Sequence, residues 1–236
     1  MRYEMSQPLP METSRSERAA FIRRTYAHLA GAILAFVALE TVAFTLLRPV
    51  LDGFMMQYLT NPLMQLLVFG GFMGSSYLAR YWAFNGGSSA MQYAGLGLYV
   101  VAEAVIFVPL LYIAIVYLRD PTVVAQAGIL TMCLFAGLTS VVLFTGKDFS
   151  FLGPILMIAS FLALGVILCA FLFGLGLGLW FSLAMIVLAA GAILYDTANI
   201  LLLYRMDQHV AASLSLFASV AMLFYYVLLA LMQSRR

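Results

Sequence analysis

One carboxylate stands out because it lies inside a long apolar stretch. Asp196 is near the end of the run from Leu177 to Leu203, with Thr197 and Asn199 close behind it. A charged side chain inside a membrane costs about 2.5–3.5 kcal/mol on insertion scales unless it is protonated, paired or facing water. The chemistry open to Asp196 is therefore proton exchange, or a transient contact with a cation such as calcium.

Two more acids, Glu40 and Glu103, also lie well within apolar runs, and no lysine or arginine lies at a comparable depth in the sequence. A carboxyl group without a counter-charge or water is expected to keep its proton. Each acid is a candidate proton or cation site, or else a neutral carboxyl that hydrogen-bonds a neighbouring helix. Calcium prefers six to eight oxygen ligands, so a site built from these acids would hold calcium only in passing.

Two further polar residues can lie beside Asp196. Asn199 follows it by three residues and therefore shares its helix face. Ser219 lies at a similar depth in the next apolar run, which crosses in the opposite direction, so its hydroxyl is expected to face Asp196. The candidate ion-sensing or proton-sensing residues are Asp196, Ser219, Glu40, Glu103 and Asn199.

The composition excludes an ordinary soluble domain. Of the 236 residues, 64% are hydrophobic and only 9% are charged, whereas a soluble domain carries about 25% charged residues. The net charge of +2 comes from scattered basic residues, which gives no reason to expect a nucleic-acid partner. No cofactor is expected, and the lipid bilayer is the expected environment.

The apolar pattern predicts an all-α, polytopic membrane protein with seven transmembrane helices. Residues 1–25 are predicted to form a polar cytoplasmic segment, and residues 26–236 the transmembrane domain. Arg48-Pro49 is expected to end the first helix, and glycines near 146 and 174–178 to separate later ones. The predicted spans are Ala27–Leu47, Pro62–Tyr81, Tyr93–Leu118, Thr122–Phe144, Phe151–Phe173, Leu177–Leu203 and Ala211–Met232.

Basic residues near the ends of the spans predict the orientation. With the N-terminus inside, eight of them fall on the inner side and four on the outer side, which favours a cytoplasmic N-terminus and an outside C-terminus. Short loops suggest a bacterial inner-membrane protein. Small residues four apart, such as Gly31 with Ala35 and Gly70 with Gly74, predict close helix packing.

Enzymatic activity is not expected. The chain has no Gly-x-Ser-x-Gly element for a serine hydrolase and no His-Glu-x-x-His spacing for a metal hydrolase. The two histidines are His28 and His209. A pair of His209 with Ser219 would have to bridge ten residues of helix, about 15 Å.

Several segments along the chain resemble the Bax inhibitor-1 family (transmembrane Bax inhibitor motif proteins). The resemblance is distributed over nearly the whole chain and implies seven helices with the last one at the centre. It is carried by Phe21-Ile22-Arg23-Arg24-Thr25-Tyr26, Phe135-Ala136-Gly137-Leu138-Thr139-Ser140, Thr145-Gly146-Lys147-Asp148-Phe149-Ser150-Phe151-Leu152-Gly153, and Leu194-Tyr195-Asp196-Thr197 with Asn199-Ile200.

The resemblance also implies a pH-sensitive calcium leak in which two aspartates on the sixth and seventh helices share protons. Asp196 matches the first aspartate by motif, while Ser219 stands where the second belongs. A serine can donate a hydrogen bond to Asp196 but cannot share a proton as a carboxylate does. Glu40 or Glu103 is a candidate to replace the missing acid.

Two functions are expected from these observations. The first is a proton-sensitive leak for cations, with Asp196 as the titrating gate residue and with calcium or protons as the species that pass or bind. The alternative is a membrane-embedded modulator that binds other membrane proteins, such as a membrane-bound protease. Residues Met1–Glu17 would then be the docking segment.

Overall fold

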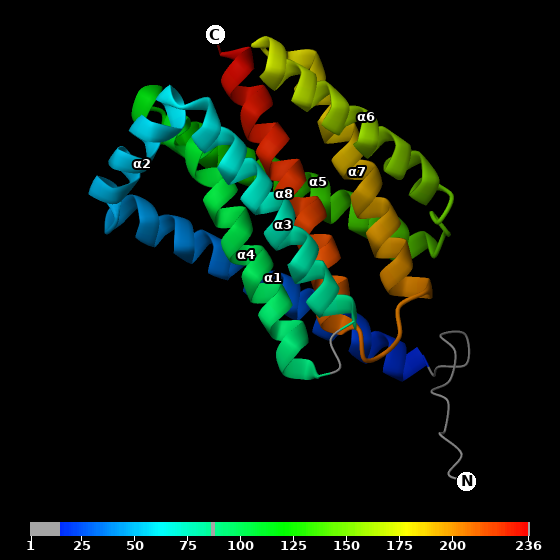
Figure 1. Cartoon of the computed structure of the whole chain (residues 1–236). Coiled ribbons are helices and arrows are strands. Elements are labelled where there is room, and N and C mark those ends of the chain that lie inside the picture. Colours follow the sequence, from blue (N-terminus) through cyan, green and yellow to red (C-terminus); the bar gives the residue numbers. More distant parts are fainter. Residues whose placement is uncertain (1–14, 86–87, 236) are drawn as a thin grey trace.

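The computed structural model describes residues 15–85 and 88–235, and within these ranges all regular structure is helical. Figure 1 shows long helices that run up and down a bundle. The elements described are α1 (Arg15–Thr45), α2 (Arg48–Thr60), α3 (Pro62–Asn85), α4 (Ser89–Tyr112) with a π-helical turn at Ile113–Tyr117, α5 (Pro121–Thr145), α6 (Leu152–Phe173), α7 (Leu179–Leu202) and α8 (His209–Ser234).

Six of the described helices are long and apolar enough to cross a membrane: α1, α4, α5, α6, α7 and α8. A long helix, α3, also lies at the second predicted span. It carries Gln65, Ser75, Ser76 and Arg80 among its apolar residues, and it is not among the six. The all-helical architecture is thus confirmed, whereas the predicted count of seven spans is not.

The last helix, α8, lies at the centre of the bundle, as the family resemblance implies. It packs against α1, α3, α4, α5 and α7, and Figure 1 shows it passing between them. Every residue from Val210 to Ala221 is buried. A helix that is apolar and buried around its whole circumference needs partners on all sides, and the surrounding helices supply them.

The first predicted loop contains a helix that the sequence pattern did not indicate. Instead of a simple break at Arg48-Pro49, α1 ends at Thr45 and α2 begins at Arg48. With 13 residues, α2 is too short to span a bilayer. Its Asp52 accepts hydrogen bonds from Tyr112 Oη at 2.6 Å and from Arg48 Nε at 2.9 Å, which tie α2 to the end of α4.

Helix α1 also begins earlier than predicted. The segment 1–25 was expected to be a polar extension, but α1 starts at Arg15, and residues 1–14 lie outside the described part of the chain. The guanidinium of Arg18 donates a 2.7 Å hydrogen bond to the carbonyl of Tyr204. The start of α1 is therefore fixed to the segment that follows α7.

The breaks predicted at glycines lie where they were expected. Gly146 follows the end of α5 with a φ of 60°, and Gly174 follows the end of α6 with a φ of 66°. A positive φ is adopted by glycine without the steric penalty of a Cβ atom. These two residues therefore allow each helix to end sharply and the chain to reverse.

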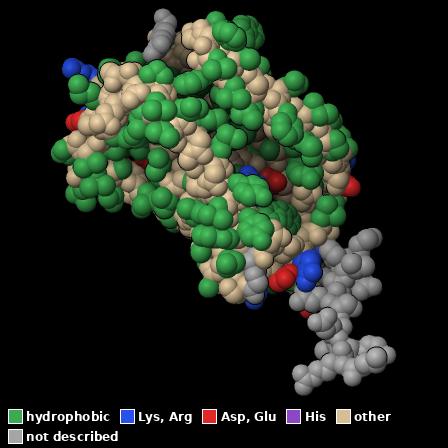
Figure 2. All heavy atoms as spheres, viewed as in Figure 1, with side chains coloured by type: hydrophobic (Ala, Val, Ile, Leu, Met, Phe, Trp, Pro, Cys, Tyr) green, Lys and Arg blue, Asp and Glu red, His purple; other side chains and the backbone are tan. Residues whose placement is uncertain are grey.

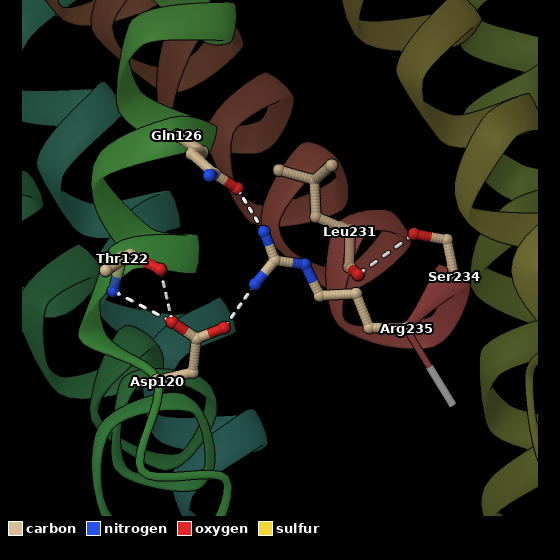
Figure 3. Close-up of polar contacts among 6 residues, drawn as sticks. All are labelled: Asp120, Thr122, Gln126, Leu231, Ser234 and Arg235. Atoms are coloured by element: carbon tan, nitrogen blue, oxygen red, sulfur yellow. Dashed lines mark hydrogen bonds and ion pairs between the residues drawn. The ribbon is translucent and has the colours of Figure 1, made fainter.

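The end of α8 is fixed to the start of α5, as Figure 3 shows. Arg235 forms an ion pair with Asp120 and also contacts the side-chain oxygen of Gln126. Asp120 accepts further hydrogen bonds from the hydroxyl and the backbone N–H of Thr122. The Thr122 hydroxyl, aided by the charge of Arg235, holds the pKa of Asp120 below its ordinary range.

Candidate functional site

The side chains of Asp196 and Ser219 meet between two packed helices. Asp196 lies on α7 and Ser219 on the neighbouring α8, and the Ser219 hydroxyl donates a 2.5 Å hydrogen bond to Asp196 Oδ2. Equal depth in two adjacent runs of opposite direction was the basis for expecting this pair. Through this hydrogen bond, the carboxyl group of Asp196 on α7 contacts the central helix α8.

A cavity of about 600 Å³ adjoins this pair. It is lined from α2, α3, α4, α6, α7 and α8, mostly by aromatic and aliphatic side chains, with Ser219 at its wall. Figure 2 shows a hollow on this face of the molecule in which both basic and acidic atoms are visible. The polar residues that line the cavity include Arg80, Tyr99, Glu103, Ser160 and Ser219.

Arg80 is the important residue that sequence reasoning missed. It was counted as a residue at the inner end of a span, because the second helix was predicted to end at Tyr81. In the structure α3 continues to Asn85, and Arg80 lines the cavity. Its guanidinium lies over the ring of Tyr99, 5.5 Å from the centroid, and it interacts electrostatically with Asp196 and with Glu103.

The expectation that no basic residue lies at the depth of the acids was therefore wrong for Asp196 and Glu103. The signal that could have found Arg80 is the continuation of the apolar run through Tyr81, Trp82 and Phe84, which puts Arg80 more than one turn before the end of the helix. The charge on Arg80 offsets part of the negative charge that these acids bring to the cavity.

Glu103 belongs to the same site as Asp196 and Ser219. It is buried on α4, one turn after Tyr99, and it interacts with the Tyr99 side chain and with Arg80. Glu103 and Ser219 both line the cavity. The structure thus places a second carboxyl group, from α4, at the wall of the cavity that Ser219 also lines.

Glu40 and Asn199 are not brought to this site. Glu40 is buried on α1, and neither of its carboxyl oxygens has a hydrogen-bond partner. The Oδ1 atom of Asn199 is also buried without a partner, so the shared helix face does not produce a bond to Asp196. Neither residue lines the cavity beside Ser219.

The two histidines lie together, away from Ser219. The rings of His28 on α1 and His209 on α8 are 5.0 Å apart. The His28 Nε2 atom is 2.9 Å from the hydroxyl of Tyr93 on α4. His209 is therefore packed against His28 of α1 instead of being oriented toward Ser219. Among the described residues, the side-chain hydrogen bond of Ser219 is the one to Asp196.

The arrangement places Glu103, Arg80 and Ser219 at the wall of one cavity, with the carboxyl group of Asp196 hydrogen-bonded to Ser219. If both acids are ionised, the group of Asp196, Glu103 and Arg80 has a net charge of −1, and one proton makes it neutral. In the described ranges, no cluster of three or more histidine, cysteine or acidic residues is placed to hold a metal ion. The site can exchange a proton and offer a small number of oxygen atoms to a cation.

Comparisons with known proteins agree with the motif resemblance. The family described as "Inhibitor of apoptosis-promoting Bax1" matches residues 18–236. Protein LIFEGUARD 4 of Arabidopsis thaliana is 30% identical over 89% of this chain and 83% of its own length. Protein LIFEGUARD 3 of the same plant is 28% identical over 93% of this chain and 86% of its own length. A BI1-like protein of the same plant is 32% identical over 49% of this chain and 47% of its own length. No solved structure matches.

Proposed function

The chain belongs to the Bax inhibitor-1 family and is a multi-pass membrane protein. From this premise we propose that it is a pH-sensitive leak pathway for cations, with calcium as the permeant ion. Asp196 is the titrating gate residue. The observation that carries the proposal is the hydrogen bond between Asp196 and Ser219 at the wall of a cavity that also contains Arg80 and Glu103.

The proposed gate works through charge. When Asp196 and Glu103 are both ionised, the site has a net negative charge that attracts a cation, because the single charge of Arg80 offsets only one of the two acids. When Asp196 takes up a proton, that attraction is lost, while the Ser219 hydroxyl can still donate its hydrogen bond to a carboxyl oxygen. Proton uptake therefore changes the affinity of the pathway for cations without requiring the helix pair to separate.

Calcium suits this site as a transient ligand. Two carboxyl groups and a few hydroxyls supply fewer oxygens than a calcium-storage site needs, so the ion would keep part of its water shell. Weak binding favours passage, because an ion that binds tightly leaves slowly. Glu103 is the proposed second acid of the pathway, and Glu40, which lies apart from the cavity, is not.

Calcium flux into proteoliposomes across a pH series tests the proposal. Wild-type protein should show flux that depends on pH, and Asp196→Asn should remove most of that dependence, because the amide has the same shape but no titrating proton. Asp207→Asn is a matched control, since Asp207 pairs with Arg205 in the loop after α7. Flux equal to that of empty vesicles, or a pH response that survives Asp196→Asn, would rule the proposal out.

The orientation is part of the proposal. The positive residues favour a cytoplasmic N-terminus and an outside C-terminus in a bacterial inner membrane. Figure 1 supports opposite sides for the two ends, because α1 begins at one end of the bundle and α8 finishes at the other. Labelling of single cysteines placed at residue 16 and at residue 234 from one side of sealed vesicles tests the orientation.

A second function, modulation of other membrane proteins such as a membrane-bound protease, is supported by a groove between α1 and α4. The groove has a volume of about 740 Å³ and is lined by small residues, including Gly31, Ala35 and Gly97. Small side chains let another helix approach closely in a membrane. Gly31→Leu should reduce co-purification of a partner and leave calcium flux intact. Residues Met1–Glu17 are the other proposed docking element, and their deletion should have the same two effects.

A further inference from the structure

The cavity beside Ser219 has a charged end and an uncharged end. Among the described residues that line it, the charged ones are Arg80 and Glu103, and Ser219 lines the same wall with Asp196 bonded to its hydroxyl. Leu229 also lines the cavity and follows Ser219 by ten residues of α8, about 15 Å along the helix axis. The cavity can therefore hold a long ligand with a charged head at one end and an apolar tail along the rest.

Four aromatic residues form a continuous part of the cavity wall. The ring centroids of Phe107 and Tyr225 are 5.3 Å apart, and both residues line the cavity. Tyr226 continues the wall, with its ring 5.3 Å from that of Tyr225 and 6.1 Å from that of Phe181. An alkyl chain can pack along these rings. Because lipid tails are as apolar as this wall, the tail adds little selectivity of its own, and the head of the ligand must supply it.

The cavity opens between two helices that pack on different partners. The main packing partner of α3 is α4, and that of α6 is α7, while α3 and α6 are not among the closely packed pairs of described helices. Figure 2 shows a hollow on the viewed face of the molecule. A ligand can therefore enter from the lipid phase between α3 and α6. The lining residues on these two sides are Leu66, Phe69 and Phe72 of α3 and Ser160, Ile167 and Phe171 of α6.

The charges at the polar end favour a cationic head. With Glu103 and Asp196 both ionised, Arg80 offsets one of them and a net charge of −1 remains. An ammonium group neutralises that charge, whereas a carboxylate or phosphate head adds to it. The faces of aromatic rings carry partial negative charge and also attract cations, and quaternary ammonium groups are commonly bound in this way.

We propose that this cavity binds a cationic amphiphile from the lipid phase, with its ammonium head at Glu103 and Ser219 and its alkyl tail along the aromatic wall. Mostly apolar pockets of about 300–1,000 Å³ with a few placed polar groups are typical of small-molecule sites, and this cavity has a volume of about 600 Å³. The inference does not rest on the proposed leak, because an amphiphile can bind here whether or not an ion passes.

Equilibrium binding to the full chain in nanodiscs tests the proposal. The probe is dodecyltrimethylammonium, whose charge does not depend on pH, and binding is measured as the excess over nanodiscs without protein. Binding should be saturable and about tenfold or more tighter than that of dodecanol, because the uncharged head makes no contact with the acids or as a cation with the rings. Dodecanoate, which has an alkyl tail and the opposite charge, should not exceed the background.

Two charge variants identify the head site. Glu103→Gln should weaken binding of the probe by about tenfold or more, because the ammonium loses its charged partner. Glu40→Gln is the matched control, since Glu40 is also a buried acid but does not line the cavity, and it should bind the probe as the wild type does. Arg80→Gln should tighten binding, because it removes the positive charge that competes with the ammonium for the acids.

A pair of variants on α6 tests the place of the tail. Ser160→Trp puts a large side chain into the cavity wall and should reduce binding of the probe. Ile158→Trp is its control, because Ile158 lies on the same helix, is 63% exposed and does not line the cavity. Binding in this variant should equal that of the wild type.

Three results would overturn the proposal. Equal binding of the three probes would mean that the tail alone is recognised. Binding of dodecanoate that exceeds that of the ammonium and is lost in Arg80→Gln would assign the cavity to an anionic amphiphile. Binding of the ammonium that is unchanged in both Glu103→Gln and Ser160→Trp would place the probe elsewhere on the protein. None of these measurements uses calcium flux, so failure of the leak and failure of this proposal are separate outcomes.

Discussion

The Ser219 hydroxyl donates a 2.5 Å hydrogen bond to Asp196 Oδ2 and thereby joins α7 to the central helix α8. A pair of carboxyl groups at this place would share a proton and titrate in two coupled steps. A serine can donate to Asp196 in either protonation state of the acid, but it has no acidic proton of its own to share. The pair should therefore respond to pH through one group instead of two.

Ser219→Asp should add a second titrating group to the pair. Two like charges in contact cannot both ionise easily, so the acids should release their protons in separate steps. We expect calcium flux in proteoliposomes to follow pH with two transitions where the wild type shows one. Ser219→Asn, which supplies a hydrogen-bond donor without a titrating proton, should keep a single transition. An unchanged profile in Ser219→Asp would contradict the assignment of this pair as the gate.

Arg80→Gln should make the cavity more negative, because it removes the positive charge that interacts electrostatically with Glu103 and Asp196. A more negative pathway attracts cations, so calcium flux at neutral pH should rise several-fold. Arg80→Lys keeps the charge and should stay close to wild type, apart from the loss of the guanidinium stacked on Tyr99. A fall in flux in Arg80→Gln, with normal folding, would show that Arg80 holds the pathway open.

Gly95→Ala should destabilise the pair of helices α3 and α4. A Cβ atom at Gly95 would lie 2.6 Å from the carbonyl oxygen of Ala79 and 2.9 Å from the backbone nitrogen of Ala83. Overpacking of this kind costs about 1–3 kcal/mol, and here the obstacle is backbone that cannot rotate away. Thermal unfolding in detergent should show a lower midpoint.

Gly97→Ala is the matched control for Gly95, because it lies on the same helix and a Cβ atom there would meet nothing within 4 Å. Its unfolding midpoint should stay at or slightly above the wild-type value, since alanine favours a helix more than glycine does. Equal destabilisation of both variants would mean that α3 and α4 are not in close contact at Gly95.

The contact between Asp120 and Arg235 should weaken at low pH. The pKa of Asp120 is below its ordinary value of 3.8 when the protein is folded, so its stabilising contribution is fully present above that value and is lost as the pH falls through the lowered pKa. We expect hydrogen exchange at the end of α8, corrected for the intrinsic effect of pH, to be slower in wild type than in Arg235→Gln at neutral pH.

That difference in exchange should disappear in strongly acidic solution, where Asp120 carries a proton and no longer attracts Arg235. Asp120→Asn should resemble Arg235→Gln at neutral pH, although it keeps an oxygen that can accept from Thr122. A difference between wild type and Arg235→Gln that persists well below the ordinary pKa of aspartate would indicate that Gln126, the other partner of Arg235, holds the end of α8.

Glycine spacing in the sequence did not reveal where helices touch. The spacing of Gly31 with Ala35 and of Gly70 with Gly74 predicted close packing, yet a Cβ atom at Gly31, Gly70 or Gly74 would meet no neighbour within 4 Å. Close approach instead occurs at Gly95. A small residue permits another backbone to come near, but the partner helix must be aligned with it, and single-chain spacing contains no information on that alignment.

The amino-acid sequence by itself determined the helical membrane architecture and the positions of most helices, and it singled out Asp196 as a candidate site residue, because apolar runs and an acid inside one of them are local properties. Its motifs also determined the family. It indicated the meeting of Asp196 with Ser219 through equal depth in neighbouring spans of opposite direction.

Only the tertiary structure decided which other polar groups share the site. It placed Arg80 and Glu103 at the cavity and left Glu40 outside it. The physical reason is that a helix of almost uniform hydrophobicity does not specify which of its sides faces which neighbour. Rotation about the helix axis and the choice of neighbours depend on side-chain packing among all the helices at once.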